Sequence, residues 1–247
     1  DLKMTDCDPI EVLYGGLDKL GPGTDEFTRQ VLRDLPRQHF SRVVDAGCGS
    51  GRQTLVLAAA LDTPIHALDN HAPFLRRLEQ RAEALGLAQR VVTHCMDMAG
   101  LADAFQDLDL LWSEGSIYNL GFAGGLEAWA PALAEGGFLV ASEMCWLDGT
   151  ATSRVKSFWH AAYPGMGSVE QNCQSARAAG YQVLSTRVLP RQAWREGYYD
   201  ILGPRAATLL QHEDATVRAL AAENIEEIEV FDEAGDSCGY VFYSLQR

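Results

Sequence analysis

The chain has 247 residues, and its 34 acidic and 20 basic side chains give a formal net charge of −14. A surface this acidic repels phosphate backbones and anionic membranes, because binding to either draws on Lys and Arg. Hydrophobic residues make up 47% of the chain, so it can bury a sizeable core, and we expect a single domain over residues 1–247. The expected partner is therefore a small-molecule substrate, with no nucleic acid and no membrane, and a homodimer is left open.

Short β-rich runs alternate along the chain with stretches of helical periodicity. We expect strands at residues 42–46, 65–69, 90–95, 109–113, 137–143, 181–189 and 239–245. Helical stretches separate the first five, as at 73–85, whose apolar residues fall on one stripe. This alternation predicts βαβ units and a parallel sheet covered on both faces, which is an α/β fold.

Three further segments frame this sheet. Residues 10–37 are expected to form an N-terminal lid helix, in which Thr24 can serve as a cap. Two aromatic-rich segments, at about 144–170 and 191–211, are expected on the substrate side. Pro131 conflicts with a helical pattern near 124–133 and should kink or split that helix.

The sequence also bears on location and metal binding. The longest strongly apolar stretch, residues 55–61, is too short to cross a bilayer, and the first residues lack the pattern of a secretory signal. The cysteines show neither a CxxC pair nor metal-ligand spacing to a histidine. We therefore expect a cytoplasmic protein without a metal site, and reduced thiols at Cys7, Cys48, Cys95, Cys145, Cys173 and Cys238.

A glycine-rich loop, Asp45-Ala46-Gly47-Cys48-Gly49-Ser50-Gly51, follows the first strand and leads into a helix. Its glycines allow a sharp turn and a close approach of a ligand to the main chain. Asp69, at the end of the second strand, can accept both hydroxyls of a ribose. A dinucleotide fingerprint would need Gly or Ala where Arg52 stands, and no phosphate-binding Lys follows the loop. A ligand with a ribose but no phosphate fits this pattern better.

At this point the sequence resembles the class I S-adenosylmethionine-dependent methyltransferases. The loop matches the motif that cradles the methionine part of the cofactor in that family. The acid that ends the second strand matches the residue that holds the ribose, and the pair after the third strand matches the residues that border the adenine. The resemblance thus assigns S-adenosyl-L-methionine to Asp45, Gly47, Gly49, Gly51, Asp69, Asn70, Asp97, Met98 and Glu114.

The resemblance also implies a fold. It is a Rossmann-like seven-stranded sheet of order 3-2-1-4-5-7-6, with the last strand antiparallel and helices on both faces. Strands 1 and 4 are then neighbours, so residues 45–51 and 113–118 face each other across the cleft where chain order reverses. More narrowly, the run WSEGSIYNLGF at residues 112–122 is similar to a subgroup of bacterial small-molecule methyltransferases of unassigned substrate, with the motif WSEGxIYNxGF.

Methyl transfer is an in-line displacement, so the main contribution of the enzyme is alignment, worth roughly 7 to 11 kcal/mol, and no metal is required. A Glu in the cleft is useful as a base or as a clamp on an amine. We expect a small acceptor, an amine, with Glu114, Tyr118 and Glu143 as catalytic candidates and Trp159, Trp194 and Tyr198 as pocket walls. The alternative is a non-catalytic sensor or assembly module that binds the same cofactor. Methylation of nucleic acid is disfavoured, because a D/N-P-P-Y/F loop is missing at position 113.

Overall fold

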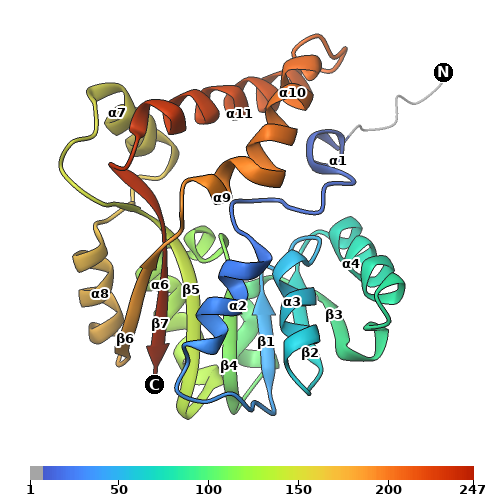
Figure 1. Cartoon of the computed structure of the whole chain (residues 1–247), viewed down its shortest axis with the longest axis vertical. Helices are drawn as coiled ribbons and strands as arrows, with labels where there is room; N and C mark the ends of the chain where they lie inside the picture. The colour runs from blue at the N-terminus through green and yellow to red at the C-terminus, as the bar shows by residue number, and fades with distance from the viewer. Residues whose placement is uncertain (1–7) are drawn as a thin grey trace.

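The computed structural model describes residues 8–247 and contains one seven-stranded sheet of order β3-β2-β1-β4-β5-β7-β6 (Figure 1). Neighbouring strands are parallel except where β7 pairs antiparallel with β5 and β6. The predicted fold class and strand order are therefore confirmed. The strands are β1 (Val43–Ala46), β2 (Ile65–Asp69), β3 (Val91–Cys95), β4 (Leu108–Ser113), β5 (Leu133–Trp146), β6 (Gln182–Val188) and β7 (Cys238–Gln246).

Each predicted strand is present, and only β5 differs much from its expected bounds. It is longer at both ends, because Leu133 pairs with β4 and Trp146 pairs with the first residue of β7. Pro131 acts as predicted: the preceding helix ends at Trp129, and a 3₁₀ turn carries the chain into β5.

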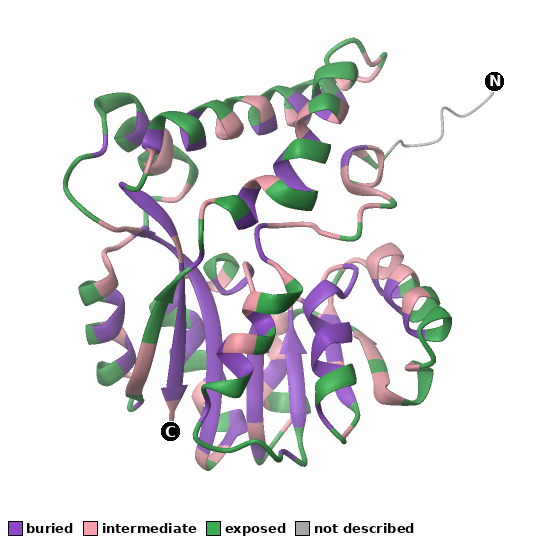
Figure 2. Cartoon of the chain, viewed as in Figure 1, coloured by how far each residue is buried: buried purple, intermediate pink, exposed green. Residues whose placement is uncertain are grey.

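Helices cover both faces of the sheet because its strands alternate their apolar side chains between two cores. Leu110 and Trp112 of β4 pack on one side with Leu57, whereas Leu111 packs on the other side with Trp129. The first face carries α2 (Asp25–Arg33), α3 (Arg52–Ala60) and α4 (Ala72–Ala84), and the second carries α5 (Leu101–Ala104), α6 (Phe122–Trp129) and α8 (Val169–Ala178). Figure 2 shows the central strands buried between these layers, whereas the edge strands β3 and β6 are more exposed.

A helical cap lies beyond the carboxyl ends of the parallel strands, at the top of Figure 1. It consists of α1 (Pro9–Tyr14), α7 (Ser153–Ala162), α9 (Gln192–Trp194), α10 (Asp200–Leu209) and α11 (Ala215–Ala234). Single turns complete the chain: η1 (Ala88–Arg90), η2 (Met98–Gly100), η3 (Ile117–Leu120), η4 (Ala130–Ala132) and η5 (Arg195–Tyr199). The cap therefore comes from the N-terminal helix α1, from the two aromatic-rich segments, which contain α7, α9 and α10, and from α11.

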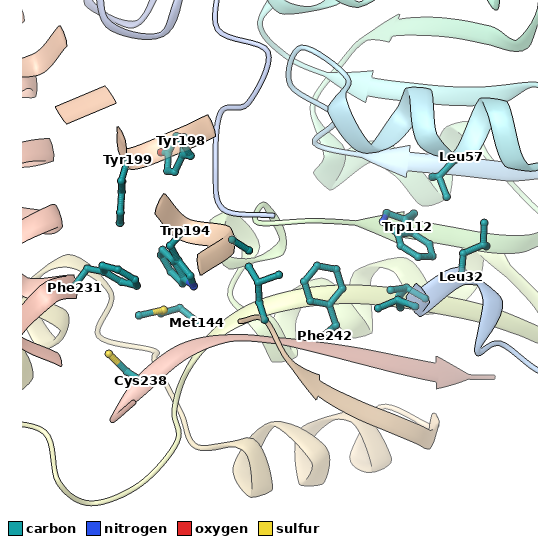
Figure 3. Packing of buried hydrophobic residues seen from close by; sticks show 14 of the residues in the cluster. Leu32, Leu57, Trp112, Met144, Trp194, Tyr198, Tyr199, Phe231, Cys238 and Phe242 are labelled. Carbon is teal, nitrogen blue, oxygen red and sulfur yellow. The ribbon is translucent and has the colours of Figure 1, made fainter. Parts of the chain in front are cut away.

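Aromatic packing attaches the cap to the sheet. Trp194 of α9 stacks on Phe231 of α11 with ring centroids 5.0 Å apart, and it contacts Tyr240 of β7 at 4.7 Å. Figure 3 shows Trp194 and Phe231 beside Met144, at the end of the core that continues to Trp112. One continuous apolar core therefore fixes the cap over the edge of the sheet.

The lid predicted at about 10–37 is not one helix, although a helix begins after Thr24 as predicted. The structure has two helices there, α1 and α2, joined by a segment of irregular backbone at residues 15–24. Gly15 and Gly16 end α1, and the second of them has a φ of 76°, which favours glycine. The predicted cap is confirmed, because Thr24 Oγ1 accepts a hydrogen bond of 3.1 Å from Phe27 N.

Cys7 lies outside the described residues. The other five cysteines are free, and all but Cys95 are buried. Between residues 8 and 247, no helix combines the length and hydrophobicity needed to span a bilayer.

Candidate active site

The loop between β1 and α3 contains three glycines in a left-handed backbone conformation. They are Gly47, Gly49 and Gly51, with φ values of 70°, 55° and 86°. Protein atoms also fill the space beside them. A Cβ at Gly47 would lie 2.0 Å from Ser116 Oγ, and one at Gly51 would lie 2.1 Å from Leu78 Cδ1. These glycines are thus required by the packing of the loop itself, besides any approach of a ligand.

Asp69 closes this loop from the end of β2. Its carboxylate accepts one hydrogen bond from Gly49 N and one from His71 N, both of 2.9 Å. Asp97, after β3, accepts from Ala99 N at 2.9 Å, and Trp129 Nε1 donates to the Met98 carbonyl at 2.9 Å. Asp69, Asp97 and Met98, together with Asn70, line one region of a shared cavity.

That cavity has a volume of about 650 Å³, within the range of small-molecule sites. It lies at the junction of the loop, the end of β4 and the cap, and this junction includes the predicted reversal of chain order between β1 and β4. The structure brings together most of the predicted site residues on its walls: Gly47, Gly49, Gly51, Asp69, Asn70, Asp97, Met98, Glu114, Tyr118, Trp159, Trp194 and Tyr198.

Two predicted residues, Asp45 and Glu143, do not line the cavity. Asp45 is fully buried beneath the loop, where Thr54 Oγ1 donates to it at 2.6 Å and Gln53 Nε2 at 3.4 Å. Burial raises the pKa of Asp45 to about 7, although these hydrogen bonds act in the opposite direction. Its carboxylate therefore joins β1 to the start of α3.

Glu143 points to the opposite face of the sheet from Met144, which lines the cavity. It is 2% exposed, and burial raises its pKa to about 7. Tyr163 donates a hydrogen bond to Oε1, whereas Oε2 has no hydrogen-bond partner among residues 8–247. Because Tyr163 itself lines the cavity, with its ring centroid 6.0 Å from that of Tyr118, Glu143 reaches the cavity only through Tyr163.

Glu114, at the end of β4, lines the cavity but is already heavily bonded. Its Oε1 accepts from Thr28 Oγ1 at 2.7 Å and from Trp112 Nε1 at 2.9 Å. Its Oε2 forms an ion pair with Arg52, and both side chains are nearly buried. A carboxylate offers about four acceptor positions, so one remains for a ligand.

The link between α1 and α2 covers the cavity. Its residues Leu20, Gly21 and Pro22 form part of the wall. Ser50 of the glycine loop donates to the Leu17 carbonyl at 3.0 Å, and Gly23 N donates to the Ala193 carbonyl of α9 at 3.2 Å. The segment is thus attached both to the loop and to the cap.

Several wall residues were missed by the sequence analysis, namely Tyr14, Tyr163, Glu227 and Tyr240. The sequence offers one signal for Glu227, because it stands directly before Ile228, an apolar residue that packs against the core. No local pattern marks Tyr14 or Tyr240, since only the docking of α1 and the pairing of β7 bring them to the site.

Comparison with known families identifies the central part of the chain. Residues 43–137, from β1 to the start of β5, match the family model described as "Methyltransferase domain". This stretch is a methyltransferase domain. The predicted enzyme class is thereby confirmed for the part of the chain that holds the glycine loop, Asp69, Asp97 and Glu114.

Relatives of the methyltransferase domain share the whole fold. Over 135 residues the chain is 30% identical to the uncharacterized protein YjhP of Escherichia coli, and this alignment spans about half of each chain, 54%. The X-ray structure of YjhP has a TM-score of 0.82 at 22% identity, covering 97% of this chain and 99% of that one.

Two S-adenosylmethionine-dependent methyltransferases, both solved in complex with S-adenosyl-L-homocysteine, also have structures similar to that of this chain. The protein from Geobacter sulfurreducens has a TM-score of 0.81 at 20% identity, covering 97% of this chain and 98% of its own. The one from Thiobacillus denitrificans has a TM-score of 0.81 at 23% identity, covering 98% and 100%. At these identities the likeness establishes the fold.

Proposed function

We propose that the chain transfers the methyl group of S-adenosyl-L-methionine to a small-molecule acceptor, an amine, by direct in-line displacement. The observation that carries this proposal is a single cavity with two different walls. One wall holds the glycine loop, Asp69 and Asp97, and the other holds aromatic rings from the cap. The homocysteine compound held by the two solved relatives is what this cofactor becomes after it gives up its methyl group.

The residues present fit the cofactor. Asp69 faces the cavity with a carboxylate whose orientation is fixed by two backbone amides, so it can accept ribose hydroxyls. Asn70, Asp97 and Met98 lie with it on the cavity wall and can border an adenine. When bound, the cofactor supplies a methyl group activated by a sulfonium. Gly47, Gly49 and Gly51 bring the loop backbone to the same cavity.

The chain's own contribution is to orient the acceptor and to exclude water. The cap and the segment at 15–24 cover the cavity, and Trp159, Trp194 and Tyr198 form its apolar wall. Glu114 can accept one more hydrogen bond, which suits a clamp on an amine N–H. Tyr118 lines the cavity directly, and Glu143 can take up a proton only by way of the Tyr163 hydroxyl.

We also propose membership of the subgroup with the WSEGxIYNxGF motif. That run covers the end of β4, the turn η3 and the start of α6, and it contains Glu114 and Tyr118. The Ser116 hydroxyl donates to the carbonyls of Ala46 and Gly47 at 3.1 and 3.2 Å. The motif therefore also has a structural role, because this contact joins the β4 loop to the glycine loop. Partners other than the small molecule are not part of the proposal, and the homodimer and cytoplasmic location stay predictions.

The test is a transfer assay. Purified protein is incubated with cofactor carrying a labelled methyl group and with panels of amines, phenols and thiols, and labelled products are separated. Label on an amine supports the proposal, whereas label on a phenol or thiol would correct the acceptor class. Tight cofactor binding without transfer to any panel member would favour the alternative, a non-catalytic sensor or assembly module. Asp69→Ala protein serves as the control that should lose both binding and transfer.

A further inference from the structure

Glu227, on the inner side of α11, lines the cavity from the cap. Tyr199 donates a hydrogen bond to its Oε1, and no described Lys, Arg or His lies within ion-pair distance of its carboxylate. Burial raises the pKa of Glu227, which shows that its charge is poorly solvated. The cap thus presents to the cavity a carboxylate that lacks a cationic partner in the part of the chain that is described.

Four tyrosines line the cavity together with this carboxylate. Tyr14, Tyr118, Tyr198 and Tyr240 line the same cavity, and they come from α1, η3, η5 and β7. Burial raises the pKa of each of these hydroxyls, and the charge of Glu227 raises it further in all four. Four separate parts of the fold therefore converge on one negative charge.

The cationic side chains near the cavity are already engaged. Arg52, the one Lys or Arg among the described wall residues, is paired with Glu114 and also bonds Asp25 and Thr28. Lys19 Nζ donates to the Glu196 carbonyl at 2.6 Å and does not line the cavity. Neither cation is free to neutralise Glu227.

A half-buried carboxylate without a counter-ion is costly, and a cation that enters the cavity would remove that cost. Aromatic faces also attract cations through the negative potential above the ring. Both features favour an ammonium group over an uncharged group of the same shape.

We propose that Glu227 is the specificity-determining residue that holds a cationic nitrogen of the acceptor. The nitrogen would lie in the part of the cavity that is lined by Tyr14, Tyr118, Tyr198 and Tyr240. This inference rests on the proposed function, since it names how that site selects an amine. It adds a residue of α11 to the site and restricts the acceptors to compounds that bind as ammonium ions. Where the bound nitrogen is itself the one that is methylated, it first gives its proton to the Glu227 carboxylate, because an ammonium has no lone pair to take the methyl group.

The experiment compares choline with 3,3-dimethylbutan-1-ol, which has a carbon in place of the quaternary nitrogen. Both probes are titrated by calorimetry with and without S-adenosyl-L-homocysteine, on the unaltered chain, Glu227→Gln, Glu227→Asp and Glu226→Gln. Glu226 is the matched control, because it neighbours Glu227 on α11 but is exposed. Thermal unfolding checks that each variant is folded; Glu227→Gln should fold, because it removes a half-buried charge without a cationic partner.

We expect the unaltered chain and Glu226→Gln to prefer choline by at least about tenfold, and Glu227→Gln to lose this preference while Glu227→Asp keeps part of it. Binding of the homocysteine compound should be the same in all four proteins. The inference is overturned if Glu227→Gln keeps the preference, or if choline binds the unaltered chain no better than the alcohol. If the unaltered chain does not bind S-adenosyl-L-homocysteine, the proposed function is contradicted instead. The choline and alcohol titrations made without S-adenosyl-L-homocysteine then still decide the role of Glu227.

Discussion

The guanidinium of Arg52 pairs with the carboxylate of Glu114 across the cavity wall, with their side chains only 9% and 5% exposed. Arg52 is the first residue of α3, and Glu114 follows the last residue of β4, so the pair joins the helix after the glycine loop to the neighbouring strand. The same guanidinium bonds Asp25 and Thr28 of α2 at 3.2 and 3.1 Å. One side chain therefore fixes α2, α3 and the β4 loop around the site.

Arg52→Met should destabilise the fold, because it leaves Glu114 buried without its counter-ion. We expect the free energy of unfolding to fall by roughly 3 to 5 kcal/mol, measured by urea denaturation. The double variant Arg52→Met/Glu114→Gln should recover much of this loss, since it removes the unpaired charge as well. Arg33→Met is the control: its partner Glu26 and Arg33 are each 58% exposed, so the loss should stay within about 1 kcal/mol. Equal losses at the two arginines would contradict this account of the buried pair.

Asp69→Ala should weaken binding of S-adenosyl-L-homocysteine. The substitution removes the charged acceptor for two ribose hydroxyls and also releases the amides of Gly49 and His71. The expected loss is on the order of 1.5 to 3 kcal/mol in binding free energy, measured by calorimetry. Asp62→Ala is the control, because Asp62 is 94% exposed, pairs with Arg90 at the surface and does not line the cavity. Unchanged affinity in a folded Asp69→Ala protein would remove Asp69 from the cofactor site.

The fold could be predicted because its signals are local and repeat along the chain. Strand and helix alternate with clear periods, and the family resemblance carried by the glycine loop and Asp69 implies which α/β fold they build. The lid is not one helix because Gly15 and Gly16 end α1, and a segment of irregular backbone separates it from α2.

The site was less predictable because its second wall depends on tertiary packing. Glu143 is the last residue of the expected strand, but only the pairing of β5 decides that Met144 faces the cavity and Glu143 does not. On α11, Glu223, Glu226, Glu227 and Glu229 are equivalent in sequence, and only the docking of the helix selects Glu227. Arg52 entered the sequence argument only as a residue that excludes a dinucleotide, because its partner is 62 positions away.

Substitution by alanine should destabilise the fold to different extents at Gly49 and Gly51, the second and third glycines of the loop. At Gly51 a Cβ meets Leu78 of α4, which is fully buried, whereas at Gly49 it meets Leu20 Cδ1 of the covering segment at 2.8 Å. We expect Gly51→Ala to lower the free energy of unfolding by about 1 to 3 kcal/mol more than Gly86→Ala, measured in urea. Gly86 is the control, because its φ of 70° carries the same left-handed strain with nothing within 4 Å.

Gly49→Ala should instead act on the cover of the cavity. Its effect on unfolding should lie nearer to that of Gly86→Ala, because the end of the Leu20 side chain can move. Leu20→Ala should relieve the added cost when the two changes are combined. Equal costs at Gly49 and Gly51 would show that the covering segment is as rigid as α4.

Glu143 should make the protein less stable as the pH rises. Its folded pKa is about 7, above its ordinary value of 4.5, because burial disfavours the charged form. Between these two values the folded chain keeps a proton that the unfolded chain has lost, so the free energy of unfolding falls across this window and stays lowered above it. The contribution is roughly 3 kcal/mol. Asp45, with a folded pKa of about 7, adds a decline of the same sign, so only a difference between variants isolates Glu143.

The measurement is urea unfolding of the unaltered chain and of Glu143→Gln at a series of pH values from 4 to 9. Glutamine keeps an oxygen for the Tyr163 hydroxyl but cannot titrate, so any constant cost of the substitution shifts the whole curve without changing its slope. The stability of Glu143→Gln relative to the unaltered chain should therefore rise between about pH 4.5 and 7 and be level above. Glu135→Gln, on the same strand but exposed, should run parallel to the unaltered chain throughout. A difference for Glu143→Gln that does not change with pH would mean that Glu143 is charged in the folded protein across this range, and it would then need a cation that the described residues do not provide.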